Sequence, residues 1–174
     1  MTLVATGVKD ARVVLVPDAE YASIAGAILQ RAWHRALCSI FIVDADPARD
    51  PDLRVESLLY ELECCVWRGV DTRLLIGGSH ENLEIAQTAF TAVRLARQHH
   101  VPARWLSRVG GTRGSHVKLV VADDNVLIGS HNWSGGAFSG QIQDSTVVTS
   151  APLAARLASF FSSQWSRAKK AKPS

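Results

Sequence analysis

The sequence predicts an α/β fold with a mixed, mostly parallel β-sheet and helices on both of its faces. Short apolar runs, which are typical of buried strands, alternate along the chain with longer segments of helical periodicity. This alternation favours strand–helix–strand units, and one later pair of strands is close enough to form a hairpin. With 174 residues, 47% of them hydrophobic, the chain is long enough to bury a core without a metal ion or disulfides.

The first half of the chain predicts two strands, each followed by a helix. The apolar run at residues 13–16 is the first strand, and Pro17 and Asp18 follow it. The first helix then has the apolar pattern Tyr21, Ile24, Ala25, Ile28, Leu29 and Ala32. A second apolar run lies around residues 38–43. The helix after it has the pattern Leu58, Leu59, Leu62 and Val66 and is expected to end at Gly69.

The second half continues the alternation. Residues 72–76 predict a strand that ends at Gly77 and Gly78, and a third helix is expected to begin near Ser79. Short strands follow at residues 103–106 and 146–148. Ser150 and Pro152 are typical of a helix start, and the last helix has the pattern Leu153, Leu157, Phe160, Phe161 and Trp165.

Nothing in the sequence divides the chain further. It contains no proline- or serine-rich linker, low-complexity tract or internal repeat. We therefore expect a single domain over residues 1–174, with residues 1–10 as an N-terminal extension and residues 167–174 as a basic C-terminal tail.

A polar motif lies between the fourth and fifth of these strands. Residues 116–123 read H-x-K-x4-D, and residues 129–132 read G-S-x-N. Alternation along a strand puts His116 and Lys118 on one face, and Ser130 and Asn132 share the same spacing after the next apolar run. The cluster of residues 123–125 between the two runs is suited to a tight hairpin turn. An imidazole, an ammonium, a hydroxyl and a carboxamide are therefore expected in one place.

These residue types suit chemistry at phosphorus. An imidazole nitrogen such as that of His116 can attack phosphorus and form a covalent intermediate. Lys118 and Asn132 can donate hydrogen bonds to the non-bridging oxygens as negative charge grows on them. With enough fixed positive charge, this chemistry needs neither a metal nor another cofactor.

The motif resembles the active-site signature of the phospholipase D superfamily, whose members break phosphodiesters. The signature occurs here once, and the chain is similar to the small single-motif nucleases of that superfamily. The resemblance implies a phospholipase D-like sandwich of helices, sheet and helices. It also implies a homodimer, in which the partner subunit's His116 protonates the leaving group. The motif residue Gly129 belongs to the same signature.

Two departures from the family pattern concern the ends of the motif. The family has six residues between the motif aspartate and the glycine, whereas five separate Asp123 from Gly129. A tighter turn would absorb the difference. The acidic residue that binds the far nitrogen of the nucleophile is usually glutamate, and the matching residue here is Asp144. Asp123 lies an odd number of residues from Lys118, so we expect it to hold the turn rather than take part in the chemistry.

Positive charge precedes the motif and ends the chain, and the formal net charge is +3. Arg104, Arg108 and Arg113 lie in or beside a glycine-rich segment that is expected to be a loop at the mouth of the site. Arg108 and Arg113 are candidates for contacts with substrate phosphates, and the basic tail could strengthen nucleic-acid binding. Both segments could equally be solvated surface without a partner.

The sequence leaves three functions open. Nucleic acid is the expected substrate, and a phospholipase acting on glycerophospholipids such as cardiolipin is the alternative. A catalytically silent nucleic-acid-binding module is the third.

No signal peptide is visible and no apolar stretch reaches about 20 residues, so we expect a cytoplasmic protein without stable membrane association. Cys38, Cys64 and Cys65 are expected to be reduced thiols. His80 is the alternative second histidine within one chain, while His131 and Trp133 are expected to pack inside.

Overall fold

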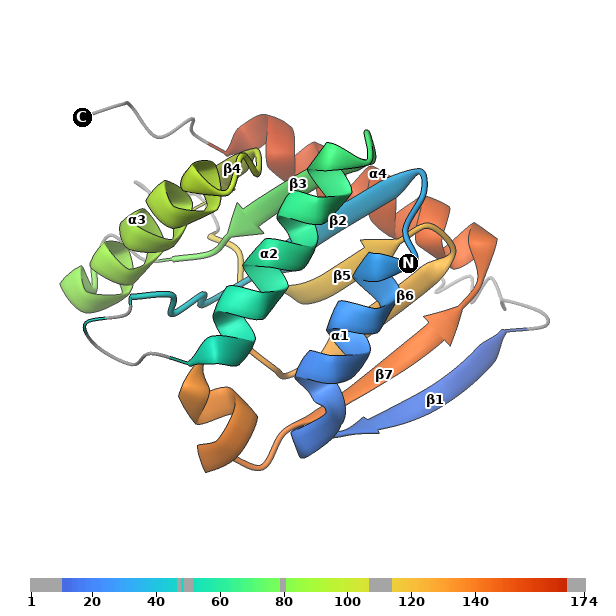
Figure 1. Ribbon diagram of the computed structural model, residues 1–174, viewed down its shortest axis with the longest axis horizontal. Helices are drawn as coiled ribbons and strands as arrows, with labels where there is room; N and C mark the ends of the chain where they lie inside the picture. The colour runs from blue at the N-terminus through green and yellow to red at the C-terminus, as the bar shows by residue number, and fades with distance from the viewer. Residues whose placement is uncertain (1–10, 47, 49–51, 79–80, 107–113, 169–174) are drawn as a thin grey trace, which may run out of the picture.

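The computed structural model describes residues 11–46, 48, 52–78, 81–106 and 114–168. Within these ranges the strands form one seven-stranded sheet in the order β1-β7-β6-β5-β2-β3-β4 (Figure 1). The strands are β1 (Arg12–Pro17), β2 (Arg35–Ile40), β3 (Asp71–Ile76), β4 (Ala103–Trp105), β5 (Lys118–Ala122), β6 (Asn125–Gly129) and β7 (Asp144–Thr149).

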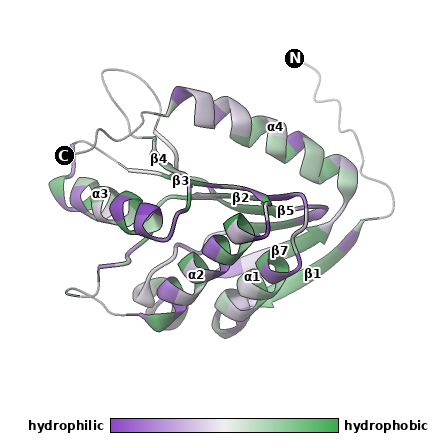
Figure 2. Ribbon diagram, turned by 45° about the horizontal axis from the view of Figure 1, so that its top comes forward, coloured by the Kyte–Doolittle hydropathy of each residue, from purple (hydrophilic) through white to green (hydrophobic). Residues whose placement is uncertain are grey.

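Helices cover both faces of the sheet. The helices α1 (Tyr21–Gln30), α2 (Leu53–Trp67) and α3 (Leu83–Gln98) lie on one face, and α4 (Ala151–Arg167) lies on the other (Figures 1 and 2). Each face has its own apolar cluster. Leu59 and Leu62 belong to the larger cluster under the three helices, and Phe161 packs with Leu37 and Leu75 under α4. The predicted α/β sheet with helices on both faces is confirmed.

The share of parallel pairing is smaller than the sequence predicts. The pairs β1–β7, β7–β6, β6–β5 and β5–β2 are antiparallel, and only β2–β3 and β3–β4 are parallel. A parallel pair needs a crossover between neighbouring strands. The units β2-α2-β3 and β3-α3-β4 provide one, but β1 does not become a neighbour of β2. It pairs at the edge with β7 instead, so the sheet is mixed but mostly antiparallel.

Local signals set most element boundaries as predicted, with two exceptions. Ser150 caps α4 by accepting a hydrogen bond from the backbone N–H of Leu153. Gly69, with φ of +77°, follows α2. The helix expected from near Ser79 begins at Leu83, because the side chain of Asn82 caps it. The strand expected at residues 38–43 begins and ends earlier, at Arg35–Ile40, where it pairs with β3.

The strand ends that carry the polar motif and its neighbours lie along one edge of the sheet. The carboxyl end of β2 lies beside the carboxyl end of β3 and the amino end of β5, since Ile40 is opposite both Ile76 and Lys118. The carboxyl end of β6 lies beside the amino end of β7, where Gly129 is opposite Ser145. We call this edge the site edge, because the residues of the polar motif other than Asp123 lie at it.

Candidate active site

His116 and Lys118 lie in contact at the site edge. The Lys118 Nζ is 3.1 Å from Nδ1 and 3.3 Å from Nε2 of His116, and 3.2 Å from the backbone oxygen of that residue. Lys118 is the first residue of β5, and His116 lies just before the strand. The ammonium group is a donor only, so it can donate to whichever imidazole nitrogen is unprotonated. The imidazole and the ammonium therefore face one place, as their spacing predicts.

Phe41 is a site residue that the sequence analysis missed. Its ring centroid lies 4.3 Å from that of His116, and the Lys118 Nζ lies 4.9 Å from the centre of the Phe41 ring. Phe41 follows the last residue of β2, which is the neighbour of β5 in the sheet. The sequence did not indicate this contact, because it depends on β2 and β5 being neighbours in the sheet. The ring packs against the imidazole and interacts with the ammonium through its negative face.

The surroundings of His116 favour its neutral form. Partial burial lowers the pKa of His116 below its ordinary value, and the positive charge of Lys118 lowers it further. Burial also lowers the pKa of Lys118. A neutral imidazole keeps a lone pair on one ring nitrogen, which is what a nucleophile needs.

Asn132 is oriented by the chain that follows β2. Its side-chain oxygen accepts a hydrogen bond of 3.2 Å from the backbone N–H of Ile42. This bond shows which end of the amide is the carbonyl oxygen. The NH₂ group at the other end is then the donor available to a substrate. Trp133 next to it is fully buried, and its indole N–H donates to the Tyr21 hydroxyl, in agreement with the expected core position.

Ser130 and Gly129 join β6 to β7. The Ser130 hydroxyl accepts from the backbone N–H of Asp144 at 3.1 Å and lies 3.2 Å from its carbonyl oxygen, to which it can donate. A Cβ at Gly129 would collide with the backbone oxygen of Asp144 and with Ser145. Only glycine allows the two strands to come this close, which is a physical reason for a glycine at this position of the motif.

Asp123 lies at the opposite end of β5, in the two-residue turn that leads into β6. Its carboxylate accepts hydrogen bonds from the backbone N–H groups of Trp33, His34 and Arg35, at 2.8–3.0 Å. Partial burial alone would raise the pKa of Asp123, but these three bonds bring it below its ordinary value. Asp123 has a φ of +51° in this turn. Its contacts are those of a residue that ties the hairpin to the start of β2.

The remaining expected site residues are Asp144, Arg108 and Arg113, together with the alternative histidine His80. The structure shows no hydrogen bond between the side chains of Asp144 and His116, and Asp144 reaches the motif through its backbone bonds to Ser130. Arg108 and Arg113 lie outside the described residues, as does His80.

Arg104 does not lie at the mouth of the site, where a cluster of arginines was expected. Its guanidinium donates to the backbone oxygen of Trp165 at 2.8 Å and lies 4.4 Å from the centre of that residue's ring system. Arg104 pairs with Leu75 across the sheet and therefore lies on the α4 face. It holds the last turn of α4 instead of lining the site.

His131 takes no part in the site. Its imidazole is fully buried and stacks on Tyr21 with the ring centroids 4.3 Å apart. Its Nδ1 lies 2.8 Å from the Ser145 hydroxyl. The expected interior position of His131 agrees with these contacts.

Comparisons with known proteins agree with this geometry. Residues 29–165 match the family described as cardiolipin synthase, PLD-like domain. The structure is similar to Nuc of Salmonella typhimurium, a phospholipase D family member, with a TM-score of 0.72, 16% identity and coverage of 94% of this chain and 99% of Nuc. NucT of Helicobacter pylori gives 0.63 and 15%, covering 91% and 98%.

A third similar structure belongs to a much longer chain. The phosphatidylserine synthase of Haemophilus influenzae has a TM-score of 0.68 and 17% identity, covering 88% of this chain but 36% of the synthase. A search of curated protein sequences found no match. At these identities the similar structures show the fold alone.

Proposed function

Since this chain belongs to the phospholipase D-like domain family, we propose that it is a metal-independent phosphodiesterase that cleaves DNA or RNA through a phosphohistidine. The observation that carries the proposal is the contact between His116 and Lys118, with Nζ 3.1 Å from Nδ1. A neutral nucleophile, a cation and an amide donor oriented by Ile42 are the groups that phosphoryl transfer needs. Their positions agree with the roles that the motif implies.

The reaction proceeds in two steps. In the first, a ring nitrogen of the neutral His116 attacks phosphorus and the bond to the leaving oxygen breaks. The partner subunit's His116, which enters this step protonated, gives that oxygen a proton. In the second, the partner subunit's His116 takes a proton from water. The water oxygen bonds to phosphorus, and the bond between phosphorus and nitrogen breaks. Lys118 and Asn132 donate hydrogen bonds to the non-bridging oxygens in both steps.

The need for a second subunit follows from this chemistry. An in-line displacement has the nucleophile and the proton donor on opposite sides of phosphorus, and one His116 cannot occupy both. A two-fold axis at the site edge would supply the second histidine. His80, the alternative within one chain, lies outside the described residues.

An apolar surface beside the site edge supports the dimer. α4 packs on β2, β5 and β6, whereas the same face of β7 and β1 extends beyond it (Figure 2). Strand register places Leu15 and Ile128 in one row on this face, and their side chains are 67% and 43% exposed. The next row contains Asp144 and adjoins Ser130. A second copy seated at the site edge would cover this surface.

Nucleic acid is favoured as the substrate by the charge of the chain. The formal net charge is +3, and basic residues end the chain at positions 167–172. Phospholipid is the second candidate, because the family description names cardiolipin synthase and the phosphatidylserine synthase has a similar fold. No helix in the described ranges could cross a bilayer.

The test is direct incubation of the purified protein with plasmid DNA, single-stranded DNA, RNA and phospholipid vesicles, in EDTA and with added magnesium. We expect cleavage of nucleic acid that EDTA does not reduce and that His116→Ala abolishes. Cleavage of phospholipid alone would establish the second candidate. Binding of nucleic acid without cleavage would contradict an enzymatic function, and a strict magnesium requirement would contradict this mechanism.

A further inference from the structure

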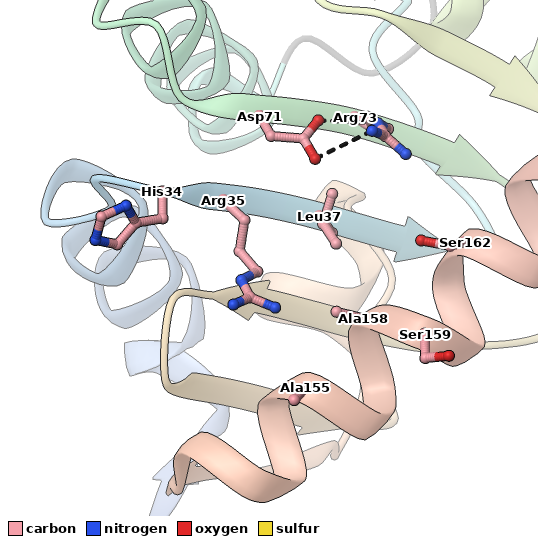
Figure 3. Close-up of a pocket in the computed structure, with 9 residues that line it drawn as sticks. All are labelled: His34, Arg35, Leu37, Asp71, Arg73, Ala155, Ala158, Ser159 and Ser162. Carbon is pink, nitrogen blue, oxygen red and sulfur yellow. Dashed lines mark hydrogen bonds and ion pairs between the residues drawn. The ribbon is translucent and has the colours of Figure 1, made fainter.

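A second polar pocket lies at the end of the sheet opposite to the site edge. It has a volume of about 440 Å³ and opens between the start of β2, the start of β3 and α4. Its polar lining consists of Arg35, Asp71 and Arg73 from the sheet, His34 just before β2, and Ser159 and Ser162 from α4 (Figure 3). None of these residues belongs to the motif.

Strand register explains why these groups meet. Arg35 is opposite Asp71 and Leu37 is opposite Arg73, so alternate residues of β2 and β3 point toward α4. Across from them α4 presents Ala155 and Ala158, whose short side chains leave the space open.

The charge of the pocket is not balanced. Arg73 and Asp71 form two contacts, at 2.9 and 3.1 Å, and neutralise each other. The half-buried guanidinium of Arg35 has no carboxylate partner within the described ranges, and in Figure 3 it points away from the Asp71–Arg73 pair. The hydroxyls of Ser159 and Ser162 make no side-chain hydrogen bond there either. One unmatched positive charge and two hydroxyl donors remain.

We propose that this pocket binds a phosphate group of a nucleic-acid strand, with Arg35 as its main ligand. A guanidinium has the planar fork of donors that matches two phosphate oxygens, and the serine hydroxyls add single donors. Trp33, which is 74% exposed, immediately precedes the pocket residue His34 and offers a flat surface for a base. The choice of nucleic acid rests on the proposed function, but the phosphate chemistry of the pocket does not.

The pocket is distant from the catalytic histidine. Arg35 and Ile40 are five residues apart along β2, a separation of about 17 Å at the usual rise of a strand. Ile40 is opposite Lys118. A substrate of one or two nucleotides at the site edge therefore cannot reach the pocket, whereas a longer strand has the length to do so. The pocket should affect long substrates and leave small ones unchanged.

The test measures binding in the His116→Ala background, so that no substrate is cleaved. A labelled single-stranded DNA of about 20 nucleotides is titrated at several salt concentrations, and inorganic phosphate is titrated separately by calorimetry. Arg35→Gln should weaken DNA binding roughly tenfold and lower the slope of log affinity against log salt by about 0.7. It should also abolish the phosphate binding that remains when Lys118→Ala is added to this background, because Lys118 can itself bind the anion at the site edge. Arg12→Gln, the same charge change at an exposed position of β1, is the control and should alter neither result appreciably.

Three outcomes would overturn the proposal. If Arg35→Gln and Arg12→Gln change the slope of log DNA affinity against log salt equally, Arg35 contributes only as general surface charge. Phosphate binding that survives Arg35→Gln in the protein that also carries Lys118→Ala would place the anion outside the pocket. Loss of phosphate binding with unchanged DNA affinity would show a site for free phosphate, not for a nucleic-acid strand.

The catalytic proposal is tested apart from the pocket. With histidine restored, hydrolysis of bis(4-nitrophenyl) phosphate should be equal in wild type and Arg35→Gln, because this ester is too small to reach the pocket. If the wild type cleaves no nucleic acid but Arg35→Gln still changes the binding slope, the proposed function fails and the pocket stands.

Discussion

Replacing Asp123 should damage the stability of the protein far more than its chemistry. The carboxylate accepts three backbone hydrogen bonds that tie the β5–β6 turn to the start of β2. Hydrogen bonds to a charged group contribute about 1.5–3 kcal/mol when buried, and water can replace part of that at a half-buried site. Counting about 1 kcal/mol for each bond gives a loss of about 3 kcal/mol for Asp123→Ala. The φ of +51° adds to this loss, because alanine tolerates that backbone region poorly.

The measurement is urea denaturation followed by circular dichroism, together with kcat on a saturating substrate well below the unfolding midpoint. Asp123→Ala should lower the midpoint without changing the slope, and kcat should stay within about tenfold of wild type. Asp124→Ala, in the same turn but exposed, is the control and should shift stability by less than about 0.5 kcal/mol. A loss below 1 kcal/mol at Asp123 would refute the structural role. A fall in kcat as large as that of His116→Ala would mean that Asp123 serves the chemistry.

The stabilisation that Asp123 gives to the folded protein should decrease at acidic pH. The folded protein holds the pKa of Asp123 below its ordinary value, so the carboxylate stabilises the fold above the unfolded pKa. That contribution is lost as the pH falls through the folded pKa, so the difference between the wild type and Asp123→Ala should shrink there to the part that the backbone conformation causes. Urea midpoints of the two proteins measured from neutral to acidic pH give this comparison, and a constant difference down to pH values below both pKa values would contradict it.

Three further predictions concern the site and the dimer. His116→Ala should lower kcat by several orders of magnitude with the fold intact, and residual activity within about tenfold of wild type would contradict a nucleophilic role. Burial and the charge of Lys118 lower the pKa of His116, so the acid limb of kcat/KM should lie below the ordinary histidine pKa of about 6.5. An acid limb above that value would contradict a nucleophile held neutral. Leu15→Glu should give a folded, inactive monomer by light scattering, whereas Leu83→Glu, at an exposed position on α3, should remain dimeric. A fully active monomer would refute the shared site.

Local chemistry made much of the fold predictable. Ser150 caps α4, and the residues around Asp123 form a tight hairpin, because both signals act within a few residues. The contact between His116 and Lys118 follows from their spacing. The order of the strands was not predictable in this way. The pairing of β1 with β7 joins residues more than a hundred positions apart, and no local signal records it.

The site features that the sequence analysis missed depend on that strand order. Phe41 meets His116 only because β2 is the neighbour of β5. The bond from Ile42 to Asn132 forms where the chain beyond β2 pairs with Trp133, outside the named strands. Arg104 was expected at the site because it is near His116 in the chain. β4 instead places it on the α4 face. Closeness in sequence did not predict whether Arg104 and His116 would lie close together in space.

The β5–β6 hairpin is held at both ends by groups that belong to other strands. At the turn, Asp123 binds three N–H groups at the start of β2. At the site edge, the end of β2 continues into Phe41 and Ile42, which contact His116 and Asn132. β2 thus fixes the register of the hairpin at one end and the positions of the candidate catalytic groups at the other. A change at Asp123 that shifts this register would displace the motif residues together, so the spacing of the motif and the bonds of Asp123 serve the same geometry.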